Sequence, residues 1–418
     1  MNRETISDRL ALAFRLPVVA LILFLALATN TASTEGLGDP VRVAGAQRLL
    51  VVAVRFPGTE PPRSLDDIRQ KADKVRRYIH MTSYGKASVA PTVSGWYEMP
   101  APLSEYRVSP HNFDVDRGRV RRLVADALGA ARRDVDIAAF QQVWIVVGAW
   151  TTPGKGYGMI AYCANPGMLS GVRRGQSRLE AVELPGGGVF KGPAVVSAAN
   201  ALVGHVVHDL LHALGGVRDG KRVVPDLYDF DLQSRPPPGA EFLPVTFAIH
   251  VGPWDIMSQH FLERKIPPPA PSSFTRLQLG WIAPDQVVDM APGETRRVTL
   301  QPLDPGKGIL AVRVRINWQR FVLIENRQPV GRDKVMPASG MVVLRIDRDG
   351  AEGRDIVQAA DANPSTATLY DAPYRPDVGE RRAYVDEMAG IAAKPLALHP
   401  DRSLEVLVTT PKGIGAGR

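Results

Sequence analysis

The chain has 418 residues, of which 45% are hydrophobic and 22% are charged, and its formal net charge is +8. This composition excludes an intrinsically disordered chain, and the length suffices for two or three folded domains. The basic residues are scattered rather than clustered, which argues against a nucleic-acid-binding protein, and a single cysteine excludes an intramolecular disulfide.

The first 33 residues have the pattern of a secretory signal peptide. Arg3, Arg9 and Arg15 precede the apolar run 16–28, and small residues follow it. This run is shorter than the roughly 20 residues that span a bilayer. We therefore predict export with cleavage, to the periplasm or the extracellular space, with an uncleaved membrane anchor as the alternative. No second apolar run of that length occurs, so we expect a mature protein that is not embedded in a membrane.

Strand and helix patterns alternate in the first half of the mature chain. Apolar runs predict strands at 48–56, 87–97 and 142–150, and helical spacing of apolar residues predicts helices at 64–83, 117–131 and 195–214. The pattern is interrupted by a Pro-rich loop at 99–110 and a Gly-rich stretch at 154–193. The Gly-rich stretch fits an edge strand with a loop at a cleft or a mobile insertion equally well. The order of elements predicts an α+β fold with a mixed sheet that supports the last helix.

The character of the sequence changes after about residue 284. A short helix is predicted at 272–281, before the change. Beyond it, apolar runs separated by Gly, Pro and Asp predict strands at 298–300, 308–316, 321–325, 341–346 and 404–408. We therefore predict a signal peptide at 1–33, a domain at 34–285 and an all-β C-terminal module at 286–418.

The long predicted helix carries two histidines, His208 and His212, with the spacing of a zinc-binding HExxH helix. At about 100° per residue, four polar side chains fall within one arc of the helix: His205, His208, Asp209 and His212. The apolar side chains take the opposite side, and Gly215 with Gly216 provides a C-cap.

Two histidines four residues apart on one helix can reach a single ion from adjacent turns. Such a pair also occurs on helices that bind no metal, so a purely structural helix face is the alternative. The acid-rich segment 225–229, which follows the glycine turn, can provide a third ligand.

Several segments of the sequence occur in an order that is typical of one family. They are the SYGK and GW motifs within 78–97, HDLLHALG at 208–215, PDLYD at 225–229, GPWDIMS at 252–258, LGWI at 279–282 and IENRQ at 324–328. Through these segments, which span about 49–347, the chain resembles the immune inhibitor A-type secreted metalloproteases, a zincin family with a metzincin-like arrangement. The resemblance implies a zincin-like catalytic domain and a zinc-dependent endopeptidase that acts on protein or peptide substrates.

The resemblance also implies the site residues. Zinc is held by His208 and His212, with Asp226 as the third ligand, and Met257 forms the hydrophobic floor beneath the metal. In the family the aspartate comes six residues after the second histidine, where this chain has Arg218, whereas Asp226 comes fourteen residues after it. We interpret 217–224 as an eight-residue insertion that forms a surface loop. Asp219, within the insertion, is the rival third ligand.

Asp209 occupies the position of the catalytic glutamate of HExxH enzymes, which takes a proton from the attacking water and delivers it to the leaving amine. Aspartate is one methylene shorter, and a misplacement of about 1 Å can cost about a hundredfold in rate. Two hypotheses follow. Asp209 is the catalytic base of an active enzyme, or the chain is a catalytically impaired, secreted, metal-stabilised binding protein.

The remaining candidates have weaker patterns. His205, His250 and His260 are more typical of solvated or hydrogen-bonded histidines than of ligands, and Tyr228 and Trp254 of packing residues, although a tyrosine near zinc can stabilise an oxyanion. Cys163 has neighbours typical of a packed thiol rather than a nucleophile. A structural Ca²⁺ ion is a further possibility, with ligands from Asp229, Asp231 and Asp255.

Overall fold

The computed structural model describes residues 36–106, 117–149, 161–163, 181–229, 250–262, 265–366, 368–377 and 383–415. These residues belong to one compact unit. The predicted signal peptide and most of the Gly-rich stretch lie outside the described residues. Across the described ranges, no helix is both long and apolar enough to cross a membrane.

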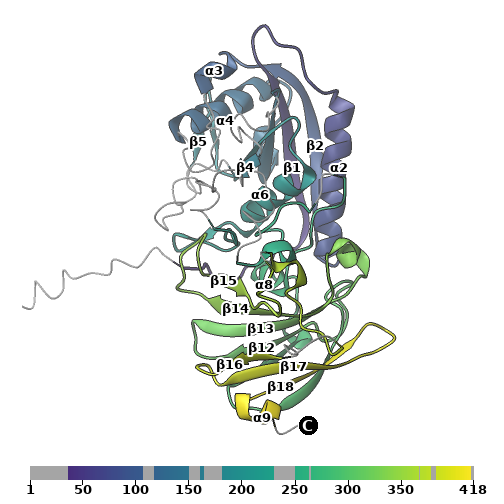
Figure 1. Cartoon of the computed structure of the whole chain (residues 1–418). Coiled ribbons are helices and arrows are strands. Elements are labelled where there is room, and N and C mark those ends of the chain that lie inside the picture. Colours follow the sequence, from purple (N-terminus) through teal and green to yellow (C-terminus); the bar gives the residue numbers. More distant parts are fainter. Residues whose placement is uncertain are drawn as a thin grey trace, which may run out of the picture. The chain divides into compact units, whose positions relative to one another are not determined.

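The N-terminal half is built on a five-stranded mixed sheet with the order β2-β1-β3-β7-β4 (Figure 1). Its strands are β1 (Gly45–Arg55), β2 (Ala87–Glu98), β3 (Gln142–Val147), β7 (Ala194–Ala198) and β4 (Ala161–Cys163). The first four are mutually parallel, and β4 is antiparallel to β7 at the edge. The three strands predicted in this half are confirmed, and the mixed sheet agrees with the predicted α+β class.

Helices cover both faces of this sheet. Alternate residues of β1 point to opposite faces, so that Leu50 and Val52 pack against α4 (Arg117–Ala131), while Leu49 and Val51 pack in the core that contains α2 and α6. Helix α2 (Leu65–Thr82) begins with a capping box formed by Ser64 and Asp67. Both predicted helices, 64–83 and 117–131, are confirmed.

The predicted helix at 195–214 is wrong in its first part. Residues 194–198 form strand β7, and helix α6 covers only Val203–Gly215. The β-branched pair Val195 and Val196 is fully buried between β3 and β4, where such side chains pack well. The four-residue connection 199–202 then places α6 in the same core as α2.

The C-terminal part contains two sheets with the orders β10-β12-β13-β14-β15 and β11-β18-β17-β16. The strands are β10 (Val287–Met290), β11 (Arg296–Leu300), β12 (Ala311–Arg315), β13 (Arg320–Arg327), β14 (Gly340–Asp347), β15 (Val357–Ala359), β16 (Tyr384–Asp386), β17 (Ile391–Leu398) and β18 (Leu404–Thr409). All five predicted strands are present, and β10, β15, β16 and β17 were missed. A hydrophobic core lies between the sheets, and the other face of β13 and β14 joins the core of α6. The boundary at 285/286 stays a prediction.

Short elements connect the larger ones. Helix α8 confirms the predicted helix at 272–281, whereas α3 lies inside the stretch predicted as a loop. The short helices, strands and 3₁₀ helices (η) are α3 (Leu103–Tyr106), α8 (Ser273–Gln278), α9 (Pro411–Gly415), β5 (Val182–Glu183), β6 (Val189–Phe190), β8 (Val217–Arg218), β9 (Lys221–Arg222), η2 (Ile137–Ala139), η4 (Gly252–Trp254), η5 (Pro284–Gln286), η6 (Gly331–Val335) and η7 (Leu369–Asp371).

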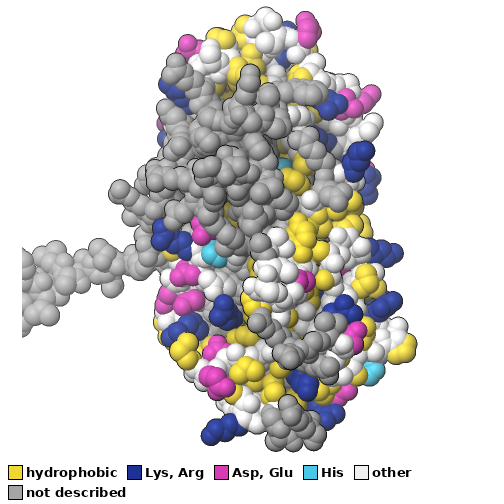
Figure 2. Space-filling model, in the orientation of Figure 1, with side chains coloured by type: hydrophobic (Ala, Val, Ile, Leu, Met, Phe, Trp, Pro, Cys, Tyr) yellow, Lys and Arg dark blue, Asp and Glu magenta, His cyan; other side chains and the backbone are white. Residues whose placement is uncertain are grey.

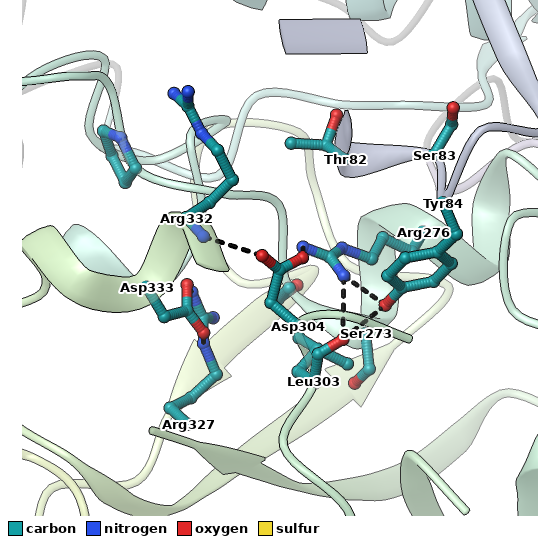
Figure 3. A network of polar contacts seen from close by, with 12 residues as sticks. Thr82, Ser83, Tyr84, Ser273, Arg276, Leu303, Asp304, Arg327, Arg332 and Asp333 are labelled. Carbon is teal, nitrogen blue, oxygen red and sulfur yellow. Dashed lines mark hydrogen bonds and ion pairs between the residues drawn. The ribbon is translucent and has the colours of Figure 1, made fainter. Parts of the chain in front are cut away.

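A buried polar network joins the segment after α2 to α8 and to the C-terminal part (Figure 3). The Arg276 guanidinium donates to the Tyr84 hydroxyl and, at 3.1 Å, to the Leu303 carbonyl, and Tyr84 also donates to that carbonyl. Arg276 is fully buried, and Asp304 lies 3.6 Å from it. The tyrosine of the SYGK motif therefore has a structural role.

A second buried arginine fixes the segment that precedes Met257. Arg327 forms two hydrogen bonds with the Asp333 carboxylate, at 2.7 and 2.8 Å, and one with Glu325 at 3.0 Å. It also donates to the Trp254 carbonyl at 2.6 Å, and its guanidinium lies over the Trp254 ring. The other oxygen of Glu325 accepts the Ser273 amide at the start of α8. The IENRQ segment therefore connects η4, α8 and the C-terminal sheet.

Candidate metal centre

Three side-chain atoms converge at one point between α6 and the loop after β9. The Nε2 atoms of His208 and His212 are 3.0 Å apart, and the Asp226 Oδ1 atom is 2.9 Å from the first and 3.0 Å from the second. All three residues are at most 5% exposed. Four-coordinate zinc with bonds of about 2.0 Å separates its ligands by about 3.3 Å, which is close to this spacing. This buried group could hold a metal ion.

The second ring nitrogen of each histidine is held by the backbone. His208 Nδ1 lies 3.2 Å from the Ile256 carbonyl, and His212 Nδ1 lies 2.6 Å from the Val224 carbonyl. A carbonyl only accepts, so each Nδ1 carries the hydrogen and each Nε2 of a neutral imidazole presents a lone pair. The lone pairs of His208 Nε2 and His212 Nε2 then face each other and Asp226 Oδ1. Because these three atoms repel one another, a cation between them stabilises the arrangement. Ligating histidines commonly have this backbone contact.

The electrostatic environment favours the ligand forms of these groups. Burial lowers the pKa of His208 below its ordinary value, although Asp226 opposes this effect. Burial by itself would raise the pKa of Asp226, but His212, the close contacts with both histidine rings and the charge of Arg222 hold it well below the ordinary range. A neutral imidazole beside an ionised carboxylate is the state in which both bind metal.

The inserted segment 217–224 supports Asp226. Strands β8 and β9 form a hairpin whose turn contains Asp219 and Gly220 in left-handed conformations. Its tip is exposed, but Arg222, Val223 and Val224 are buried. The predicted surface loop is therefore wrong for the second half of the segment. Asp219 lies at the exposed tip, and the donor set contains Asp226 instead.

Two residues that the sequence did not reveal hold the second Asp226 oxygen and the backbone beside it. Arg222 Nη1 donates to Asp226 Oδ2 at 2.9 Å and to Glu352 Oε1 at 2.8 Å. The same Glu352 oxygen accepts the Asp226 amide at 3.0 Å. Burial raises the pKa of Glu352, and Asp226 raises it further, against the effect of Arg222. Glu352 is 126 residues from Asp226 in the sequence, so no local pattern points to it.

Met257 packs in the same core as α6, and its role as the floor beneath a metal stays a prediction. It is fully buried in the core that contains α6, and its carbonyl accepts the Leu227 amide at 2.9 Å. The preceding residue, Ile256, provides the carbonyl for His208. The turn therefore orients one histidine and the residue next to Asp226.

Two further histidines lie beside the donor set. The His260 ring centroid is 4.0 Å from that of His208 and 5.2 Å from that of His205. Burial, together with His208 and His205, holds the pKa of His260 well below its ordinary value. Tyr228 lies 5.6 Å from His260. Neither His260 nor His205 belongs to the group of converging atoms found in the described chain.

Asp209 is 4% exposed and lies on the helix between the two histidine ligands. Burial, followed by the charges of Asp226 and Asp209, raises the pKa of Tyr228 well above its ordinary value. The Asp209 carboxylate is therefore within electrostatic range of Tyr228.

The proposed calcium ligands have other partners. Asp255 accepts hydrogen bonds from Ser272, Thr275 and the Met257 amide, so its carboxylate caps α8 and fixes the turn. Asp229 lies 3.8 Å from His250, whose φ is 73°. Asp231 and the side chain of Cys163 lie outside the described residues.

Replacement of Arg222 by methionine is expected to weaken metal binding about 10- to 100-fold, because Asp226 Oδ2 and Glu352 lose their shared donor. The measurement is a competition titration with a zinc-selective chelator. Arg218→Met is the matched control, since Arg218 lies at the exposed tip of the same hairpin. Equal affinities of the two variants would show that Arg222 does not support the site.

Comparison with known proteins adds no relative. No family model matches the chain, and no curated protein matches it. The resemblance to the immune inhibitor A-type metalloproteases therefore stays a prediction from the sequence segments.

Proposed function

We propose that the chain is a secreted zinc-dependent endopeptidase with a zincin-like catalytic domain. The observation that supports this most is the convergence of His208 Nε2, His212 Nε2 and Asp226 Oδ1, with both Nδ1 atoms on backbone carbonyls. Two imidazoles and one carboxylate are a ligand set that suits zinc, and three protein ligands leave a position for water or substrate. The two imidazole nitrogens and the single carboxylate argue against Ca²⁺ and Mg²⁺ as the resident ion, because these cations prefer oxygen ligands.

A zinc ion at this point would supply the positive charge that polarises a peptide carbonyl and acidifies a water molecule. The residues of the chain provide the proton transfers. Asp209 accepts the proton of the attacking water and donates it to the nitrogen of the leaving amine. Tyr228, whose raised pKa keeps its hydroxyl protonated, donates a hydrogen bond to the Asp226 carboxylate and so supports this ligand.

The second candidate function is that of a secreted metal-stabilised binding protein without turnover. The observation in its favour is the aspartate at position 209. Its carboxylate is one methylene shorter than that of glutamate, and the whole second half of α6 is buried, so the helix has little freedom to move it toward the metal.

Substitution of Asp209 tests catalysis separately from metal binding. Zinc-loaded protein is expected to cleave casein-derived peptides, and Asp209→Asn is expected to lower kcat by about 10²- to 10⁴-fold with unchanged zinc content, because the amide has the same shape and accepts no proton. The assay is peptide cleavage followed by mass spectrometry, with and without a chelator.

Asp209→Glu separates the two candidates. A fall from a measurable rate identifies aspartate as the working base. Activity that arises only in Asp209→Glu supports the binding protein. Stoichiometric zinc with no cleavage by either form excludes the peptidase.

A further inference from the structure

A pocket of about 610 Å³ opens beside the first turn of α6. Its walls come from α2 with Arg63, from residues 199–204, from Phe261 and residues 265–268, and from Arg332. Within the described residues, one lining side chain is anionic, Asp67, and six are cationic: Arg63, Lys71, Lys74, Arg77, Lys265 and Arg332. Figure 2 shows Lys and Arg side chains along the edge of the molecule where α2 runs in Figure 1.

The one carboxylate among the described lining residues already has partners. Asp67 accepts hydrogen bonds from the Ser64 amide and hydroxyl, and these bonds, in the first place, lower its pKa. It therefore completes the capping box of α2 and, as an ionised carboxylate, offsets one of the six positive charges. Arg77 pairs with Asp73, which leaves the pocket with a clear excess of cations.

The innermost cations are positioned by the backbone. Lys71 Nζ donates to the Ala199 and Ala201 carbonyls at 2.8 and 2.9 Å. The Arg332 guanidinium stacks on the Tyr78 ring, 4.7 Å from its centroid, and Nη2 lies 3.3 Å from the Pro268 carbonyl. In Figure 3 the Arg332 backbone contacts Asp304 while the side chain extends away from that network.

The outer cations are Lys74 and Lys265. Both are exposed, and neither makes an ion pair with any other described residue. The pocket thus has cations held by the backbone in its interior and two exposed ammonium groups at its mouth.

The pocket adjoins the metal centre through α6. Gly204 lines the pocket and is one helical turn before His208, which corresponds to about 6 Å along the helix axis. On the other wall, the Phe261 ring centroid is 5.4 Å from that of His205, and the preceding residue, His260, contacts His208. An extended peptide advances about 3.3 Å per residue. A side chain held in the pocket is therefore about two or three residues from a bond at the metal centre.

We propose that this pocket is a substrate subsite that binds an acidic side chain of a peptide, a glutamate or aspartate near the bond to be cleaved. The role of the pocket as a substrate subsite rests on the proposed peptidase function. Binding of an acidic peptide to the pocket does not depend on cleavage. Val203 and Gly204, in the first turn of α6, line the pocket, so the positive end of the helix dipole adds to the attraction for a carboxylate. Ile68 and Ile266 line the same pocket and provide apolar contact for the methylene groups of the side chain.

The test measures binding of a fluorescein-labelled hexaglutamate peptide to the full-length protein by fluorescence anisotropy. The double variant Lys74→Glu/Lys265→Glu is expected to weaken binding about tenfold or more, because it reverses two charges at the mouth. The matched control is Lys307→Glu/Lys412→Glu, which changes the net charge equally at exposed positions outside the pocket. The control is expected to bind within about twofold of the unmodified protein.

Equal losses in the two double variants would overturn the proposal, since they would show attraction by net charge alone. Cleavage of paired peptides that differ only in Glu or Gln separates the two proposals. Pocket-dependent binding without any cleavage leaves the subsite intact and contradicts the peptidase. Cleavage with equal preference for Glu and Gln, together with unchanged binding in the pocket variant, contradicts the subsite alone.

Discussion

Replacement of His212 by alanine is expected to reduce bound zinc from about one ion per chain to less than a tenth of an ion. The variant loses one of three ligands, and the remaining His208 and Asp226 cannot enclose an ion. Since an ion bound only by the folded state stabilises it, the loss is also expected to remove about 4 kcal/mol of stabilisation at a zinc concentration 1,000 times the Kd. Metal analysis and thermal unfolding with and without zinc measure both effects.

His205→Ala is the control for this experiment. His205 lies about two turns before His212 on the same helix and is also buried, but it is not part of the converging group in the described chain. It is expected to retain its zinc and the zinc-dependent rise in Tm. If both variants lost zinc equally, the ligand set would be wrong, because the loss would follow damage to α6 in general.

Replacement of Arg327 by alanine is expected to destabilise the protein by about 3–5 kcal/mol. Arg327, Glu325 and Asp333 are at most 1% exposed, and removal of the guanidinium leaves two buried carboxylates without their cation. The Asp333 and Glu325 charges also raise the pKa of Arg327 against the effect of burial, so the arginine stays charged. Urea unfolding measures the change, and zinc content reports whether the site still forms.

The control for Arg327 is an exposed ion pair of the same chemistry. Arg297 lies 3.3 Å from Glu405, and its side chain is 71% exposed. Arg297→Ala is expected to change stability by no more than about 1 kcal/mol. If Arg327→Ala cost no more than Arg297→Ala, the buried cluster would not be the connection between the Met257 turn and the C-terminal sheet.

The sequence predicted the elements whose patterns are local. The strand 48–56 and the helix 64–83 have clear periodicity, and the predicted metal ligands His208, His212 and Asp226 come together in space. Residues 194–198 misled the interpretation, because a short apolar run before a helix fits a helix or a buried strand equally well. The pairing of residues 194–198 with β3 and β4 shows that the run is a strand.

The parts of the site that the sequence did not predict depend on distant contacts. Glu352 reaches Asp226 from the loop between β14 and β15, and His260 reaches His208 from the far side of a segment outside the described residues. The charged residues of 217–224 predict a surface loop, yet Arg222 is buried between the carboxylates of Asp226 and Glu352. A charged side chain can be buried when oppositely charged partners are buried beside it. Glu352 is far from Arg222 in the sequence, so no local pattern predicts this burial.

The most direct measurement of the metal centre is X-ray absorption at the zinc K edge of the purified, zinc-loaded protein. We expect two imidazole nitrogens and one carboxylate oxygen at about 2.0–2.2 Å from the zinc ion, with the remaining position filled by a light atom. A sulfur ligand at about 2.3 Å would show that Cys163 binds the ion instead. A shell of oxygen atoms alone, or a protein that retains no zinc, would contradict the assignment of His208, His212 and Asp226.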